Sequence, residues 1–176
     1  MLVFGWWQGR IDMMDMLHPT GEWSARLMVV AMMIGPMSGV FGPRLWLGWL
    51  LARRRALGVA AFSYALLHLI FYIADMGNLD DMLAEFQAPG IWTGWAALAL
   101  MIPLAATSNN AALRALRARW KQVQRLVYLA AFLTLLHWFW VHNSYGAAIV
   151  HFAPLALLWI SLFVKKPLSS LKAQGV

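Results

Sequence analysis

Five apolar segments follow one another along the chain and are separated by shorter polar stretches. Each segment is close to the roughly 20 residues that cross the hydrocarbon core of a bilayer, the third and fifth being shorter. Because a bilayer offers the backbone no hydrogen-bonding partner, each segment predicts a helix that satisfies its own N–H and C=O groups. We therefore predict an all-α integral membrane protein, a bundle of about five transmembrane helices. The segments cover residues 23–41, 56–75, 91–106, 123–141 and 147–163.

The stretches around these segments predict shorter elements. Pro19-Thr20-Gly21 is a turn signal within a polar lead-in. Residues 45–51 indicate a short interfacial piece, because they are too few to span and end in three arginines. Residues 79–86 predict a surface helix. Ser108-Asn109-Asn110 is a good N-cap for a basic helix over 111–119.

We expect one domain over residues 1–176. It would comprise an outer lead-in (1–22), the helical bundle (23–164) and a cytoplasmic tail (165–176). No internal repeat is evident.

The composition supports a membrane protein and excludes several chemistries. Of the 176 residues 62% are hydrophobic and 12% charged, whereas a soluble domain is roughly half apolar. The chain has no cysteine, which excludes disulfides, thiolate catalysis and iron–sulfur clusters. No glycine-rich dinucleotide fingerprint or phosphate loop is present, so a nicotinamide or flavin domain is not expected.

The charged residues alternate between the two sides of the predicted bundle. Twelve of the 14 Lys and Arg residues lie between the first and second spans, between the third and fourth, or after the fifth, and all seven acidic residues lie on the opposite side. Basic residues in short loops mark the cytoplasmic face. We therefore expect the N-terminus outside and the C-terminus cytoplasmic, in a bacterial inner membrane. The basic loops predict contacts with anionic membrane lipid or a cytoplasmic partner rather than with nucleic acid.

The histidines inside the apolar segments are the candidate functional residues. An ionisable group at membrane depth is costly and marks a functional site by default, and imidazole is a common axial ligand of haem iron. At about 1.5 Å per helical residue, His68 lies roughly 10 Å from the boundary at Asp75, and His137 lies roughly 8 Å from the boundary at His142. Their two spans run in the same direction, so the rings can face each other at one level. We predict that His68 and His137 ligate the iron of a haem b; the alternative is that each packs and hydrogen-bonds to a neighbouring helix.

The other histidines are less decisive. His151 lies at a depth similar to that of His137 and is predicted to bind the cofactor, either as a ligand or as a partner of a haem propionate, with simple packing as the alternative. His18 and His142 lie in the outer polar zone, where solvated histidines are usual. No carboxylate is expected in the middle of a span, because all seven acidic residues lie outside the spans or at their boundaries, and this disfavours a histidine-gated transporter.

Several motifs, taken in order along residues 17–160, are similar to one known group. They resemble the ferric-reductase-like transmembrane family, and within it the haem-binding subunits of methionine sulfoxide reductases. The matching pieces are His18-Pro19-Thr20-Gly21, Arg54-Arg55-Ala56-Leu57-Gly58, Tyr64-Ala65-Leu66-Leu67-His68, Leu104-Ala105-Ala106-Thr107-Ser108, Arg119-Trp120, Arg125-Leu126-Val127-Tyr128-Leu129 and Leu136-His137-Trp138.

The resemblance implies a b-type cytochrome that takes electrons from quinol or a cytoplasmic flavin reductase and passes them outward to a periplasmic molybdopterin enzyme. His68 and His137 stand where that family keeps haem-ligating histidines. Gln124 stands where the family has another histidine, so one haem is expected and a second is the alternative. The family usually has one more N-terminal span, where this chain has only the apolar residues 1–7.

The sequence thus predicts an electron-transfer subunit of an oxidoreductase rather than a stand-alone enzyme. Quinol or a partner redox subunit near the outer level would be the donor, because the inner half of the bundle has no evident redox centre. An external or periplasmic redox protein would be the acceptor. The alternative is a structural membrane subunit of a larger complex, in which haem is absent or not essential.

Overall fold

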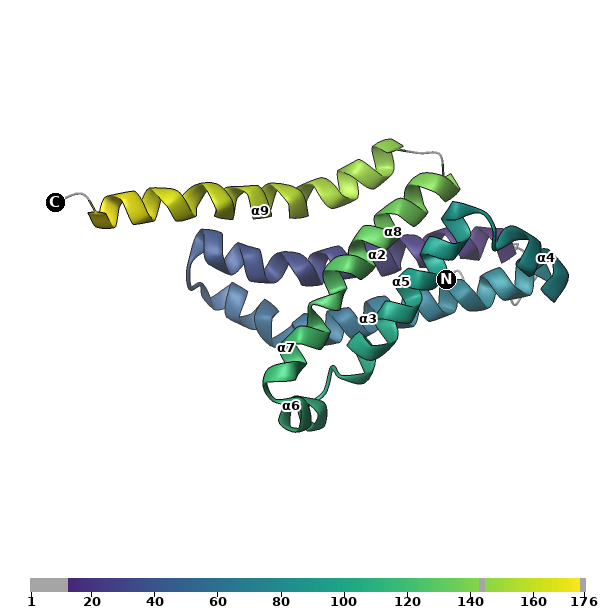
Figure 1. The fold of residues 1–176 in the computed structure, drawn as a ribbon, viewed down its shortest axis with the longest axis horizontal. Coiled ribbons are helices and arrows are strands. Elements are labelled where there is room, and N and C mark those ends of the chain that lie inside the picture. The colour runs from purple at the N-terminus through teal and green to yellow at the C-terminus, as the bar shows by residue number, and fades with distance from the viewer. Residues whose placement is uncertain (1–12, 143–144, 175–176) are drawn as a thin grey trace.

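The computed structural model describes residues 13–142 and 145–174, and all their regular elements are helices (Figure 1). Five of these helices are long and apolar enough to cross a membrane, over Asp15–Phe41, Leu45–Met76, Pro89–Ala106, Ala118–Val141 and Tyr145–Val164. The predicted all-α fold is therefore confirmed, and the chain is a multi-pass integral membrane protein. Residues 1–7 lie outside the described part. The elements are α2 (Met13–Phe41), α3 (Leu45–Met76), α4 (Leu79–Glu85), α5 (Pro89–Ala106), α6 (Asn110–Leu116), α7 (Ala118–Gln124), α8 (Leu126–His142) and α9 (Tyr145–Gln174).

The helices pack as two antiparallel pairs, and a fifth long helix, α9, packs against one member of each pair. α2 packs along α3, and α5 packs along α8. The pairs meet where α5 contacts α3 and α8 contacts α2, and α9 packs on α2 and α8 (Figure 1). Small buried residues, among them Ala61, Ala130 and Ala148, lie at these contacts. Small side chains let helix backbones approach closely, which is the usual basis of helix association in lipid.

The turn predicted at Pro19-Thr20-Gly21 is wrong, because α2 runs without interruption from Met13 to Phe41. The hydroxyl of Thr20 donates to the carbonyls of Met16 and Leu17, both at 2.8 Å. Hydroxyl groups of this kind, together with neighbouring helices, allow a spanning helix to tolerate proline. The first spanning helix therefore begins well before residue 23.

The separate interfacial piece predicted at residues 45–51 is also wrong, because these residues form the first turns of α3. Nothing between them and residue 56 breaks a helix, and arginine has a high helix propensity. The guanidinium of Arg53 lies 3.7 Å from the centroid of the Trp49 ring one turn earlier. This contact keeps the charge on the exposed helix surface.

The two shorter predicted helices are present. In α4 the side chain of Asn78 caps the N-terminus by accepting from the Asp81 N–H. In α6 the predicted cap is formed by Asn109, which accepts from the Ala112 N–H. The predicted basic helix is interrupted at Arg117, whose φ of 47° lies in the left-handed region, and resumes as α7.

Candidate functional site

His68 on α3 and His137 on α8 face each other between the two helix pairs. Their ring centroids are 6.2 Å apart and the ring planes are inclined at 81°. Both side chains are half-buried. The structure thus brings together the two histidines that the sequence placed at a common depth.

A backbone carbonyl of the neighbouring helix holds each ring. The Nδ1 of His68 lies 2.9 Å from the Leu17 carbonyl oxygen on α2, and the Nδ1 of His137 lies 2.6 Å from the Gly90 carbonyl oxygen on α5. A carbonyl oxygen only accepts, so Nδ1 is the donating nitrogen in each ring. In a neutral imidazole the lone pair then lies on Nε2.

A glycine one turn further along the same neighbouring helix makes room for each ring. A Cβ on Gly21 would lie 3.0 Å from Nδ1 and Cε1 of His68. A Cβ on Gly94 would lie 2.7 Å from Nδ1 and 2.8 Å from Cε1 of His137. Real Cβ atoms essentially never make contacts below 3.0 Å. Each imidazole therefore packs directly on the backbone of a glycine, and any larger residue at that position would occupy the space of the ring.

A threonine precedes each of these glycines and donates to the same carbonyl as the histidine does. The Thr20 hydroxyl bonds to the Leu17 carbonyl, and the Thr93 hydroxyl bonds to the Gly90 carbonyl at 2.9 Å. Both threonines are buried. On both α2 and α5, a backbone carbonyl, the threonine three residues later and the glycine that follows it form the same contact surface for a histidine ring. We call this surface the cradle. Sequence reasoning missed these residues, although the repeated Thr-Gly dipeptide in the first and third spans was a visible signal.

A cavity of about 110 Å³ lies beside the two rings, among α2, α3, α5 and α8. Its walls are mostly small or apolar, for example Ala25, Ala97 and Met101, and it is partly open to the surroundings. Two neutral imidazoles presented from facing helices are a donor set that suits haem iron, so His68 and His137 would hold a haem here and the haem would supply a one-electron centre. Within the described residues, no group of three or more His, Asp or Glu side chains is arranged to hold a bare metal ion.

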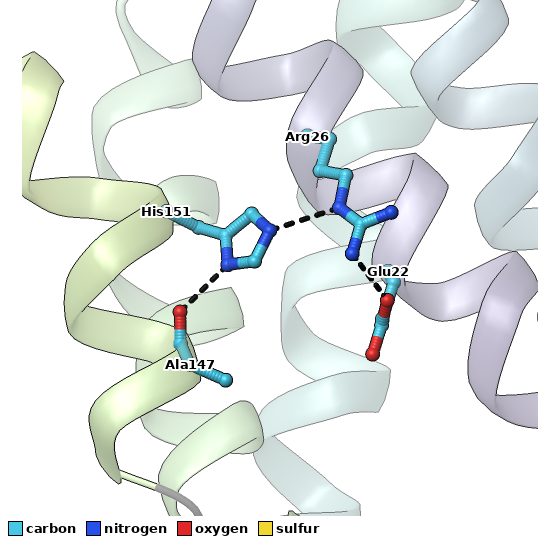
Figure 2. A network of polar contacts seen from close by, with 4 residues as sticks. All are labelled: Glu22, Arg26, Ala147 and His151. Atoms are coloured by element: carbon cyan, nitrogen blue, oxygen red, sulfur yellow. Dashed lines mark hydrogen bonds and ion pairs between the residues drawn. The ribbon is translucent and has the colours of Figure 1, made fainter.

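His151 does not join this pair and lies in a separate polar network (Figure 2). Its Nδ1 lies 2.6 Å from the Ala147 carbonyl oxygen, and its Nε2 accepts from Nε of Arg26 at 2.9 Å. The ring packs on Trp138 with a centroid separation of 5.1 Å. Both ring nitrogens therefore have protein partners, and the role of His151 in cofactor binding stays a prediction.

Glu22, which the sequence placed just before the first span, lies within the first long apolar helix. The spanning helix begins at Asp15, so it includes both Glu22 and Arg26, whose side chains form a 2.5 Å ion pair one turn apart (Figure 2). Pairing at this spacing on a helix neutralises charge that would otherwise be costly in a membrane. Glu22 also lines the cavity beside the two histidines. The sequence assigned no role to Arg26, although it lay within a predicted span.

The side chain of Gln124 hydrogen-bonds to the C-terminal end of α5. Its amide nitrogen donates to the Leu104 carbonyl at 3.2 Å and to the Thr107 hydroxyl at 2.9 Å. The Trp120 indole nitrogen donates to the Thr107 carbonyl at 2.8 Å. Gln124 lines a second cavity, which no histidine of the described residues borders.

The fold and the facing histidines define a class, the polytopic helical membrane proteins that carry a paired-imidazole site between spanning helices. Residues 20–135 match the family described as "Ferric reductase like transmembrane component". The chain belongs to this family.

Curated relatives agree with this membership. One from Brucella melitensis biotype 2 is 36% identical over 148 residues, covering 81% of this chain and 65% of the relative. One from Polaromonas naphthalenivorans is 38% identical over 151 residues, covering 81% and 67%. Both are named "Protein-methionine-sulfoxide reductase heme-binding subunit MsrQ". The chain thus spans about two thirds of the length of the relatives it matches, and no solved structure matches it.

Proposed function

We propose that this chain is a membrane b-type cytochrome subunit that relays electrons, through a haem held by His68 and His137, to a partner redox protein. The observation that carries the proposal is the pair of facing imidazoles at 6.2 Å, each with its Nδ1 fixed by a carbonyl. The printed name of the relatives, a heme-binding subunit, supports the same cofactor.

The chain's own groups would prepare the two ligands. The Leu17 and Gly90 carbonyls fix the tautomer and the ring direction, and such outer partners also raise the basicity of a ligating imidazole. Gly21 and Gly94 leave the space that the two rings occupy. A bound haem would supply a one-electron centre whose potential depends on its axial ligands and burial.

The pair lies toward the acidic end of the bundle. Leu17 is near the start of α2 and Gly90 near the start of α5, which follows the acidic helix α4. With the basic loops on the cytoplasmic side, this end faces outward from a bacterial inner membrane, with the C-terminus inside. Quinol or a redox subunit near the outer level would then donate electrons. The name of the relatives suggests a methionine sulfoxide reductase as the external acceptor.

Spectroscopy and haem quantification on the purified full chain test the proposal. We expect one haem per chain and a Soret band that shifts on reduction with dithionite. His68→Ala and His137→Ala should each lose it, while His151→Phe, which keeps a ring against Trp138, should retain it. Circular dichroism and the elution volume check that all three variants are folded.

A full haem complement in either folded alanine variant would refute the ligand assignment. Loss of haem in His151→Phe would instead make His151 a cofactor residue. A colourless wild-type chain that co-migrates stoichiometrically with other membrane subunits would favour the structural role.

A further inference from the structure

A second cavity, of about 370 Å³, lies away from the histidine pair, among α2, α3, α5, α7 and α8. Four basic residues line it, Arg54 and Arg55 from α3 and Lys121 and Arg125 from α7 and its C-cap. No acidic residue lines it. The one ion pair found among the described residues, Arg26 with Glu22, involves none of these four. The cavity therefore concentrates positive charge that no carboxylate of the described chain neutralises.

Neutral partners hold the two arginines in place. Arg54 donates from Nε to the Ala31 carbonyl on α2 at 3.0 Å. Arg55 donates to the side-chain oxygen of Asn110 at 2.6 Å, and its guanidinium lies 5.5 Å from the Trp120 ring centroid. These contacts orient both guanidinium groups without cancelling their charge. Arg55 is half-buried, while Arg54, Lys121 and Arg125 are exposed at the rim of the cavity.

Most of the remaining lining of the cavity is apolar, with polar groups added by Ser108, Gln124 and Tyr128. Met28, Met32, Phe62 and Val127 contribute to its walls, and Met28 and Met32 belong to the buried core of the bundle. A ligand that suits this cavity has a compact anionic group for the arginines and an apolar part for the helices. A free inorganic anion would use only half of the site.

We propose that this cavity binds the headgroup of an anionic phospholipid, with its phosphate among Arg54, Arg55, Lys121 and Arg125. Guanidinium groups match phosphate geometry, and basic pockets between spanning helices on the cytoplasmic side are suited to anionic headgroups. The apolar wall that includes Met28, Phe62 and Val127 takes the start of the acyl chains. This site is separate from the histidine pair and does not depend on haem.

The test compares lipid binding by the delipidated full chain in detergent, followed by native mass spectrometry. Phosphatidylglycerol is titrated against phosphatidylcholine for the wild type, for Lys121→Gln/Arg125→Gln, and for the control Arg114→Gln/Arg119→Gln. The control pair removes the same charge from exposed positions on α6 and α7 that do not line the cavity. Loss of two basic groups should weaken phosphatidylglycerol binding about 30-fold in the cavity variant. The control should bind as the wild type does.

Three results would overturn the proposal. Equal weakening in the control pair would mean that the binding reflects the general basic surface. Inorganic phosphate that binds as tightly as the lipid and displaces it would mean a site for a soluble anion. Loss of haem from the folded cavity variant would mean that the cavity holds porphyrin carboxylates instead. The two lipid-binding readouts do not depend on whether His68 and His137 bind haem. Only the measurement of haem content in the cavity variant does.

Discussion

Replacing Gly94 by alanine puts a methyl group where the ring of His137 now rests. The new Cβ would lie 2.7 Å from Nδ1 and 2.8 Å from Cε1, whereas ordinary van der Waals contact begins near 3.4 Å. The ring must therefore move by about 0.7 Å, or α5 must move away from α8 by as much. Gly90 and Gly94 belong to the same helix, so either movement also strains the 2.6 Å bond from Nδ1 to the Gly90 carbonyl.

The free-energy cost of Gly94→Ala is the sum of three contributions. Overpacking a well-packed site costs about 1–3 kcal/mol, and a weakened hydrogen bond costs about 0.5–1.5 kcal/mol. Alanine in place of glycine inside a helix returns roughly 0.5–1 kcal/mol. The net loss is about 0.5–4 kcal/mol, which corresponds to about a 2- to 700-fold weaker affinity for haem if the displaced ring is a ligand.

Haem titration and thermal unfolding in detergent measure the effect. Gly21→Ala, with a 3.0 Å approach to His68, should be milder than Gly94→Ala. Gly48→Ala is the matched control, because it also lies within a helix and a Cβ there meets nothing within 4 Å. If Gly94→Ala keeps the haem affinity and the thermal stability of the wild type, the absence of a side chain at Gly94 is not needed to accommodate the His137 ring.

Three further substitutions test other contacts. Thr93→Val removes the hydroxyl that donates to the Gly90 carbonyl, so the histidine's own bond strengthens and the midpoint potential should fall in a redox titration; a rise would contradict this. Ser24→Ala removes the 2.9 Å bond to the Ala61 carbonyl between α2 and α3 and should lower stability in detergent by about 0.6–1.7 kcal/mol, measured by thermal unfolding. Asn109→Ala removes the cap of α6 and should cost about 1 kcal/mol, seen as faster amide exchange confined to α6; unchanged exchange would show that the cap contributes nothing there.

The sequence alone determined which segments cross the membrane. Length and hydropathy suffice for this, because lipid forces each apolar segment to complete its own backbone hydrogen bonds. Helix ends were less certain, since local signals compete with context. Pro19-Thr20-Gly21 predicted a turn, but the Thr20 hydroxyl and the packing of α2 on α3 kept the helix intact.

The common depth of His68 and His137 was also available from the sequence, because the rise of a helix converts residue numbers directly into depth. Rotation about the helix axis is not available in this way. Only the packed structure decided that the two rings turn toward each other, while His151 turns to Arg26.

The cradle and the basic cavity came from tertiary structure alone. The sequence analysis placed Gly21 in a turn and gave Gly94 no role, and both matter because a histidine of a neighbouring helix packs on each. The arginines of α3 and the basic residues of α7 are more than sixty positions apart in the chain, yet they line one cavity. Hydropathy and spacing report on one helix at a time, whereas a site between helices depends on their crossing and rotation, which side-chain packing at every contact determines together.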